Sequence, residues 1–306
     1  MSFQYIVKRL AQGLLVLIGI AVAVFFMIHL IPGDPVARIL GERATPEAVA
    51  NLRHELGLDL PLHLQLIRYF VNLAHGDLGR SLLTGVPVAQ DLGTRFLLTF
   101  RLAIMALLIE SFLGITVGVI AAVKRGSIWD SMTMSTAVLG MSLPSFWLAI
   151  FLMWIFGYAL GWFPISGYSG WWSLVLPAFT LGILSAAYIA RVTRSSLLDV
   201  LDQDYIRTAR SKGLGERTVL FKHVLRNALI PIITMIGLDL GYLLGGAIIT
   251  ETVFALPGVG RFVVQGILTR DFPVVQGGTL FIAGTFVIVN LLVDLTYSLV
   301  DPRIRH

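Results

Sequence analysis

The sequence predicts an all-α protein that crosses a membrane six times. Hydrophobic residues make up 56% of the 306 residues, only 13% are charged, and the mean hydropathy is +0.83. A soluble domain of this length could not bury so much apolar surface, so lipid must be the solvent for most of it. A backbone in lipid must satisfy its own hydrogen bonds, and the alternating segments of a membrane barrel are absent, which favours helices.

The six apolar spans follow one another along the whole chain. The first has 22 residues without a formal charge and covers roughly 33 Å as a helix, enough to cross a bilayer. It is longer than the apolar region of a signal peptide and no small-residue cleavage site closes it, so we expect it to be retained. The predicted spans are residues 10–31, 97–122, 131–160, 174–190, 228–250 and 279–299.

Lysine and arginine in the short connections predict the orientation of the spans, with both termini in the cytoplasm. The connection 161–172 has no Lys or Arg, and 251–278 has only two, so both are expected outside. The basic residues that mark the cytoplasmic side are Lys8, Arg9, Lys124, Arg125, Arg303 and Arg305.

The long segment between the first two spans is expected to form an external, periplasmic cap. It contains two amphipathic stretches, Pro46–Leu56 and Leu62–Leu73, which predict two helices. The predicted organisation is an N-terminal transmembrane helix (1–31), the cap (32–96), a five-helix core (97–299) that includes a cytoplasmic coupling loop (191–227), and a cytoplasmic tail (300–306).

Enzyme motifs are absent from the sequence. The pair His54-Glu55 begins a zinc-protease motif, but its second histidine would have to be residue 58, which is Leu58. The segment 167–170 matches the GxSG of intramembrane serine proteases, but no later span supplies a histidine as base. There is no cysteine, no phosphate-binding loop and no ligand spacing among the six histidines. We therefore expect no catalytic, cofactor or metal site on this chain, and no nucleic-acid partner.

Two acidic residues lie within predicted spans, where charge is costly and usually functional. Asp239 lies roughly 160° around its helix from a ridge of small residues, Gly237, Gly241 and Gly245. If that ridge packs on a neighbouring helix, the opposite face meets a translocation cavity; the alternative is that Asp239 is tied to another helix by a hydrogen bond. The residues predicted to line the cavity are Met235, Asp239, Tyr242 and Gly246.

Glu110 and Pro144 predict features of packing. Glu110 shares a face with Gly114 and Gly118, so we expect a structural hydrogen bond at a helix interface. Pro144 removes a backbone hydrogen bond inside the third span and predicts a kink, which either borders the pathway or only shapes packing.

The segment 191–226 is the longest basic stretch between apolar spans, with eight Lys or Arg and four Asp or Glu. Its apolar residues Leu197, Leu198, Leu201, Tyr205 and Ala209 recur at helical spacing and predict one helix that ends at Gly213. One interpretation is a helix lying on anionic lipid. The other, which we favour, is a helix with a fixed corner that docks a cytoplasmic partner. The predicted docking residues are Asp204, Tyr205, Arg207, Thr208, Ala209, Arg210, Lys212 and Gly213.

At this loop the sequence resembles the membrane permeases of ATP-binding-cassette (ABC) importers, in particular the first, B-type permease of the dipeptide/oligopeptide/nickel family, to which glutathione permeases are close. Gly213 stands at the glycine of the importer signature, and Arg207-Thr208-Ala209 stands at its EAA triplet. Other blocks that resemble the family are 31–35, 56–59, 76–81, 256–261, 270–276 and 301–305.

The resemblance implies a type I importer permease in the bacterial inner membrane, working by alternating access. Its partners would be a related second permease in a heterodimer, two cytoplasmic ATPases that carry ATP and Mg, and an external solute-binding protein. The solutes would be dipeptides, oligopeptides, glutathione or chelated nickel. The rival hypothesis is a self-sufficient, proton-coupled secondary transporter with Asp239 and Glu110 as proton sites, and a third is a membrane scaffold. Inverted repeats would favour the secondary transporter, and none is seen in the sequence.

Overall fold

A computed structural model of the chain describes residues 3–30, 36, 40 and 45–300. The sequence blocks 31–35 and 301–305 and the predicted tail therefore lie outside the described residues, apart from Val300. The described part is helical, with one isolated antiparallel bridge between Arg80 and Pro87. This agrees with the predicted all-α class.

The long helices confirm a protein that crosses the membrane several times. Within the described residues, five segments are long and apolar enough to span a membrane, and the count is six where a pair of helices bent at 103° is taken as one broken span. The spanning helices are α1 (Phe3–Leu30), α5 (Val88–Val123), the pair α6 (Ile128–Ser142) and α7 (Ser145–Leu152), α8 (Val175–Leu201), α11 (Arg226–Gly246) and α14 (Phe272–Val300). Several extend beyond the predicted spans: α5 begins before residue 97, and α8 continues past residue 191.

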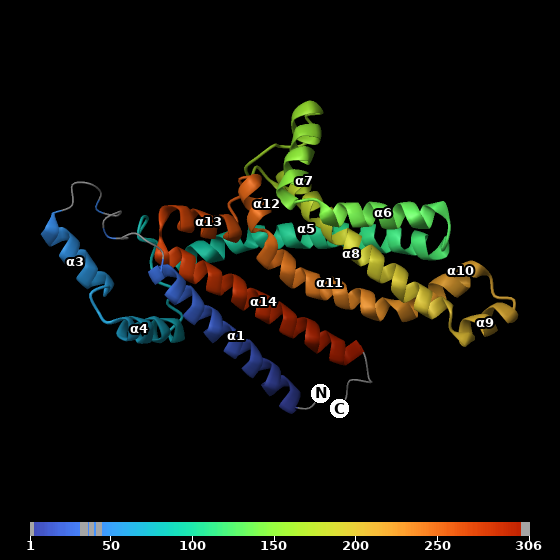
Figure 1. The fold of residues 1–306 in the computed structure, drawn as a ribbon, viewed down its shortest axis with the longest axis horizontal. Helices are drawn as coiled ribbons and strands as arrows, with labels where there is room; N and C mark the ends of the chain where they lie inside the picture. The colour runs from blue at the N-terminus through green and yellow to red at the C-terminus, as the bar shows by residue number, and fades with distance from the viewer. Residues whose placement is uncertain (1–2, 31–35, 37–39, 41–44, 301–306) are drawn as a thin grey trace.

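The third span is broken at Pro144, where the sequence predicts a kink. Leu143 and Pro144 both have extended backbone; the proline ring disfavours helical backbone in the residue before it, and proline has no N–H to continue the helix. The segments on either side, Ile128–Gly140 and Ser145–Ala159, meet at 103°. Figure 1 shows α7 standing away from the long axis that the other spans follow. The second segment ends in a π-helical stretch, Met153–Ala159.

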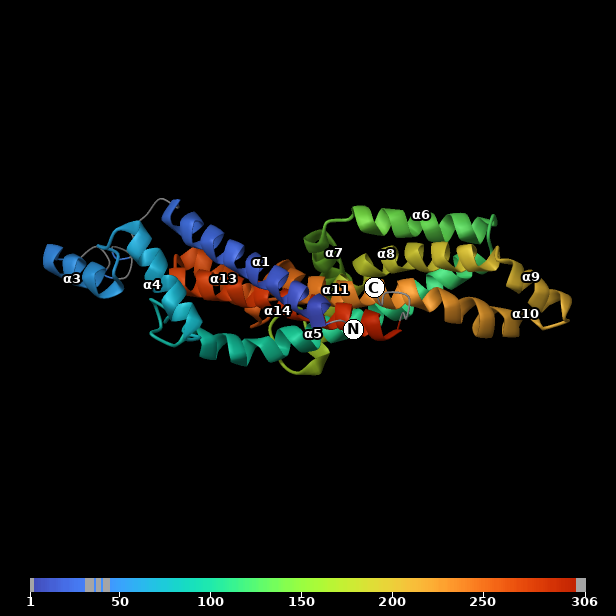
Figure 2. The ribbon, with the colours of Figure 1, turned by 90° about the horizontal axis from the view of Figure 1, so that it is seen from below.

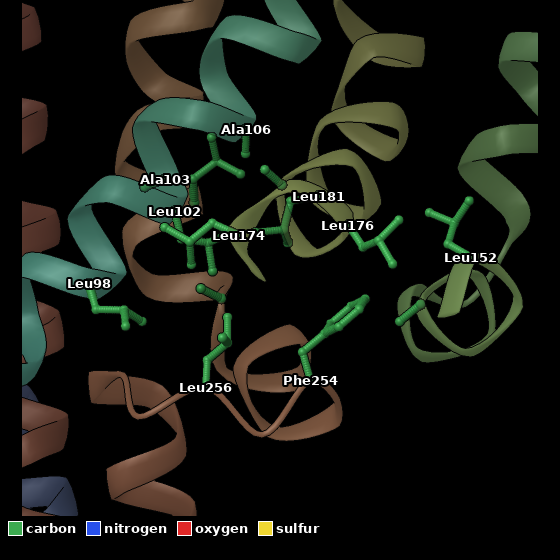
Figure 3. Packing of buried hydrophobic residues seen from close by; sticks show 14 of the residues in the cluster. Leu98, Leu102, Ala103, Ala106, Leu152, Leu174, Leu176, Leu181, Phe254 and Leu256 are labelled. Carbon is green, nitrogen blue, oxygen red and sulfur yellow. The ribbon is translucent and has the colours of Figure 1, made fainter. Parts of the chain in front are cut away.

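Helices α5 and α8 form the core through close backbone approach. A Cβ atom added at Gly114 would lie 2.6 Å from a side-chain carbon of Ile189, and one at Gly118 would lie 2.5 Å from Thr193. Gly182 of α8 meets Ile109 in the same way. The predicted packing edge beside Glu110 is therefore confirmed. Next to this contact, α5, α7 and α8 bury a cluster of leucines together with Phe254 and Leu256 (Figure 3).

The two ends of the molecule carry short helices. At one end lie α3 (Pro46–Leu56) and α4 (Leu62–Ala74), close to the predicted bounds, and at the other lie α9 (Asp204–Ser211) and α10 (Glu216–Thr218) (Figures 1 and 2). Helix α4 lies against the end of α1, where the Tyr69 ring stacks on Phe25 with centroids 5.8 Å apart. Two further helices, α12 (Ile248–Val253) and α13 (Val259–Thr269), join α11 to α14.

Candidate functional site

The predicted docking residues are gathered on α9 and the turn after it. Seven of them are exposed: Asp204, Tyr205, Arg207, Thr208, Arg210, Lys212 and Gly213. Ala209 is 7% exposed and packs inward, so it anchors the helix. The charged side chains are thus exposed. Figure 2 shows the short helix that carries them, α9, at one end of the molecule.

The apolar face predicted for this region is wrong in one respect. The chain does not continue as one helix from Leu197 to Ala209, because α8 ends at Leu201 and α9 begins only at Asp204. Helical spacing does not carry across that break. Ile206, which the pattern missed, is fully buried, whereas Tyr205 is 44% exposed. Ile206 and Ala209 pack in one cluster with Leu197, Val219 and Val224, which fixes α9 on the two neighbouring segments.

The corner at Gly213 is confirmed by its backbone. Its φ is +78°, a left-handed conformation that glycine adopts without steric cost. The Arg210 side chain crosses the turn and makes two hydrogen bonds to Glu216, at 2.9 and 3.3 Å. Such bidentate pairing fixes geometry as well as charge.

A further contact connects α9 to the following span. The Asn227 side chain donates to the Tyr205 hydroxyl at 3.1 Å, and a π-helix, Val219–Leu225, continues directly into α11. Helix α9 is therefore joined to α11 by a side-chain hydrogen bond and by continuous helix.

The connection between α5 and α6 is joined to the same end of the bundle. The Arg194 guanidinium of α8 makes two hydrogen bonds to the Asp130 carboxylate, at 2.7 and 2.8 Å. Arg125 pairs with Asp202 at 3.2 Å, just where α8 ends. Neither pair is visible in the sequence, since the partners lie far apart in the chain.

Glu110 and Asp239, assigned to separate roles from the sequence, face each other across α5 and α11. Glu110 is fully buried and its carboxyl interacts with that of Asp239. The Ser185 hydroxyl is also near Glu110, but neither carboxyl oxygen of Glu110 has a well-formed hydrogen bond to a described residue. The structural hydrogen bond predicted for Glu110 is therefore wrong, because the group that α11 brings to it is a second acid and not a donor. Oδ2 of Asp239 is likewise buried without a hydrogen-bond partner in the described part of the chain. Two acidic side chains thus meet in the membrane-spanning region, where few hydrogen-bond donors lie near them.

The glycine ridge of α11 packs on α14, as the cavity argument requires. A Cβ atom at Gly237 would lie 3.0 Å from Val293, and one at Gly241 would lie 3.3 Å from Phe286. On the other side of α11, Tyr242 is 62% exposed, Met235 is half-buried and Gly246 is the last residue of the helix. That these residues line a translocation cavity stays a prediction.

Away from α9, a buried carboxylate organises α12 and α13. Glu251 is fully buried; it accepts a hydrogen bond from the Thr99 hydroxyl at 2.5 Å and one from the Arg261 backbone N–H at 3.1 Å. Thr99 in turn accepts from the Val259 backbone N–H at 3.0 Å. This carboxylate therefore joins α5 to the first turn of α13. Glu251 precedes the 256–261 block and was not among the residues predicted from the sequence.

Comparison with known proteins gives consistent matches over nearly the whole chain. Residues 114–306 match the family described as "Binding-protein-dependent transport system inner membrane component", and residues 2–112 match its N-terminal component. The chain is 44% identical to the dipeptide transport system permease protein DppB of Alkalihalophilus pseudofirmus, over 99% of each chain. It is also 44% identical to the glutathione transport system permease protein GsiC of Salmonella paratyphi A, over 99% of each chain.

A solved structure supports the same fold. The inward-facing MetNI methionine ABC transporter contains a chain that superposes with a TM-score of 0.61 at 19% identity. The match covers 69% of this chain and 97% of that one. At this identity the likeness shows the fold alone.

Proposed function

Because this chain belongs to the family of binding-protein-dependent transport system inner membrane components, and is thus a permease subunit of an ABC importer, we propose that it carries peptides or peptide-like solutes inward. The support for this solute class is the function printed for its full-length relatives, which are a dipeptide and a glutathione permease. The chain is a multi-pass protein of the inner membrane, and its family is non-catalytic.

The observation that carries the coupling proposal is the anchored helix α9. Its buried residues, Ile206 and Ala209, hold it on the bundle, while the charged residues beside them stand exposed. We propose that this surface docks a cytoplasmic ATPase. ATP and Mg would bind the ATPase, and its closure would move α9 and, through the Asn227–Tyr205 contact, α11. A helix lying on lipid would need neither the fixed corner at Gly213 nor the Arg210–Glu216 pair.

The further partners belong to the same proposal. We expect two ATPases, an external solute-binding protein that delivers solute to the α3–α4 end, and a second, related permease. Large apolar side chains on α7 and on the π-helical stretch that follows it are 40% exposed or more, among them Trp147, Phe151 and Trp154, and offer surface to lipid or to that second permease.

Purification of the assembled transporter tests the proposal. This chain is isolated gently from native membranes, its partners are identified by mass spectrometry, and ATP hydrolysis is measured in the eluate. We expect Arg207→Glu to weaken recovery of the ATPases by about tenfold, because it reverses an exposed charge at the docking surface. Arg68→Glu, an exposed arginine on α4 at the other end, is the matched control.

The outcomes distinguish an ATP-driven importer from a secondary transporter. Uptake that needs ATP, and that is lost when the ATPases dissociate, supports the importer. A chain that is isolated alone and carries solute with a proton gradient and without ATP would favour the secondary transporter. In that case Arg207→Glu would behave like the Arg68→Glu control.

A further inference from the structure

A cavity of about 370 Å³ opens beside the turn that joins α12 to α13. The first half of α5 provides one wall, with Thr94, Arg95 and Arg101, and the facing wall comes from Tyr168 and Pro257. Its volume lies within the range of small-molecule sites, about 300–1,000 Å³. Neither the docking surface on α9 nor the residues around Asp239 belong to it.

Three segments that are distant in sequence converge on this cavity: α5, the connection 161–172 and the turn that follows α12. The Gly167 backbone N–H donates to the Phe254 carbonyl at 2.8 Å, which fastens the connection 161–172 to the end of α12. The Arg261 guanidinium donates to the Ala255 carbonyl and holds the same turn. The Lys and Arg counts predict that 161–172 and 251–278 are external. The cavity therefore lies at the predicted external side, where solute would arrive.

Arg95 is held firmly at one wall of the cavity. Its guanidinium lies over the Phe262 ring, 4.5 Å from the centroid, and interacts electrostatically with the Glu251 carboxylate. That carboxylate already accepts hydrogen bonds from Thr99 and the Arg261 backbone. The Nε atom of Arg95 is buried without a hydrogen-bond partner among the described residues. Arg95 thus adds a positive charge to this wall, and its guanidinium is positioned by Phe262 and Glu251.

Arg101 is the second cation of the cavity. It lies six residues further along α5, about 9 Å along the helix axis, and is exposed. Within residues 45–300 the structure describes no ion pair for it. Leucines 97 and 98 lie between the two arginines on the same wall. The charge of Arg101, beside these apolar side chains, is available to an anionic partner that enters the cavity.

We infer that this cavity is a solute site at the external mouth of the pathway, in which Arg101, with Arg95 beside it, binds the free carboxylate of a peptide or peptide-like solute. The planar guanidinium matches a carboxylate in a bidentate geometry, and the apolar wall strengthens the attraction. The hydroxyls of Thr94 and Tyr168 offer neutral hydrogen bonds to the amide groups of the same solute. This inference rests on the proposed function for the class of solute.

A cysteine placed in the cavity tests the site without relying on transport. The chain has no cysteine, so Leu97→Cys introduces a single thiol into it, on a side chain that is 52% exposed in the cavity wall. Leu108→Cys, at a position that is 66% exposed on the same helix and outside the cavity lining, is the control. The assembled transporter is placed in phosphatidylcholine nanodiscs, and labelling of this chain is followed with trialanine or trialanine amide present.

We expect trialanine to protect the Leu97→Cys thiol at about tenfold lower concentration than its amide, the order that loss of one charge-assisted hydrogen bond implies. Arg101→Gln should remove that difference, whereas Arg68→Gln should leave it. The Leu108→Cys thiol should not be protected.

Other outcomes overturn the inference. Equal protection by acid and amide would show that no carboxylate is recognised. Protection by the binding protein alone, without solute, would mean that one of its acidic residues occupies the site. Loss of the protection by trialanine when anionic phosphatidylglycerol is added would assign the arginines to lipid phosphate.

Failure of the proposed function has a different signature. If trialanine protects the thiol better than its amide does, but the transporter takes up no peptide, the site stands and the peptide-import proposal fails. If peptides are taken up and trialanine gives no protection, the import proposal stands and the site fails.

Discussion

The hydroxyl of Ser81 donates a hydrogen bond to the carboxylate of Asp271, 190 residues later in the chain, at 2.5 Å. The Leu82 backbone N–H donates to the other carboxylate oxygen at 3.1 Å. Ser81 and Asp271 are both 5% exposed or less. The turn before α5 is therefore fastened to the residue that precedes α14, and two of the sequence blocks that resemble the importer family meet at this point.

Removal of the Ser81–Asp271 contact should destabilise the assembled protein. We expect a coupling free energy of about 1.5–3 kcal/mol, since the hydrogen bond is buried and its acceptor is charged. A double-mutant cycle of Ser81→Ala and Asp271→Ala, followed by thermal unfolding, measures it. Ser169→Ala, at an exposed serine, is the control. Additive effects of the two substitutions would show that the contact contributes nothing.

A methyl group at Gly258 should disrupt the contact between α12 and α13. A Cβ atom there would lie 2.2 Å from the Glu251 carboxyl, which is fully buried and cannot move away freely. We expect Gly258→Ala to cost about 1–3 kcal/mol in stability, the usual range for overpacking. Gly93→Ala is the matched control, because a Cβ at this helical glycine meets no atom within 4 Å. Equal melting temperatures for the two variants would contradict the prediction.

Ionisation of Glu251, which lies outside the spanning segments, should make stability depend on pH. Burial raises the pKa of this carboxyl above its ordinary value, and hydrogen bonds from Thr99 and from the backbone of Arg261 and Gly260 oppose that shift only in part. The folded state therefore binds the proton more tightly than the unfolded state. The resulting stability is complete below the ordinary pKa, about 4.3, and is lost as pH rises through the raised one.

The variant Glu251→Gln isolates this effect, because its amide does not titrate. We expect the melting temperature of the wild type, relative to that of the variant, to fall as pH is raised from about 4. A difference that stays constant with pH, or grows in favour of the wild type, would contradict the assigned direction.

A hydrogen-bond donor between Glu110 and Asp239 should stabilise the contact of α5 with α11. In Glu110→Gln the side-chain amide supplies a donor of nearly the same shape to Asp239, whose Oδ2 has none in the described part of the chain. We expect the variant to be at least as stable as the wild type, and more stable by about 1 kcal/mol than Glu110→Met, which fills the space without a donor. Equal stability of the two variants would show that the donor makes no contact with Asp239.

The sequence alone predicted a large part of this structure. Apolar runs and flanking charges predicted the spans. A chain in lipid must form helices to satisfy its backbone hydrogen bonds, and charged residues remain at the helix ends, where they reach water. Gly213 and the cap helix Pro46–Leu56 were predicted because turns and helix starts depend on residues close in the chain. The glycines beside Glu110 predicted close packing for the same local reason: small residues mark where a neighbouring backbone comes near.

Tertiary structure alone decided which distant groups meet. The Ser81–Asp271 hydrogen bond, the meeting of Glu110 with Asp239 and the cavity between Arg101 and Tyr168 each depend on how separate helices are placed. It also decided that Ile206 is buried, because the break after α8 resets the helical phase. Periodicity describes one helix at a time, whereas a side chain's partner is fixed by packing that many residues determine together.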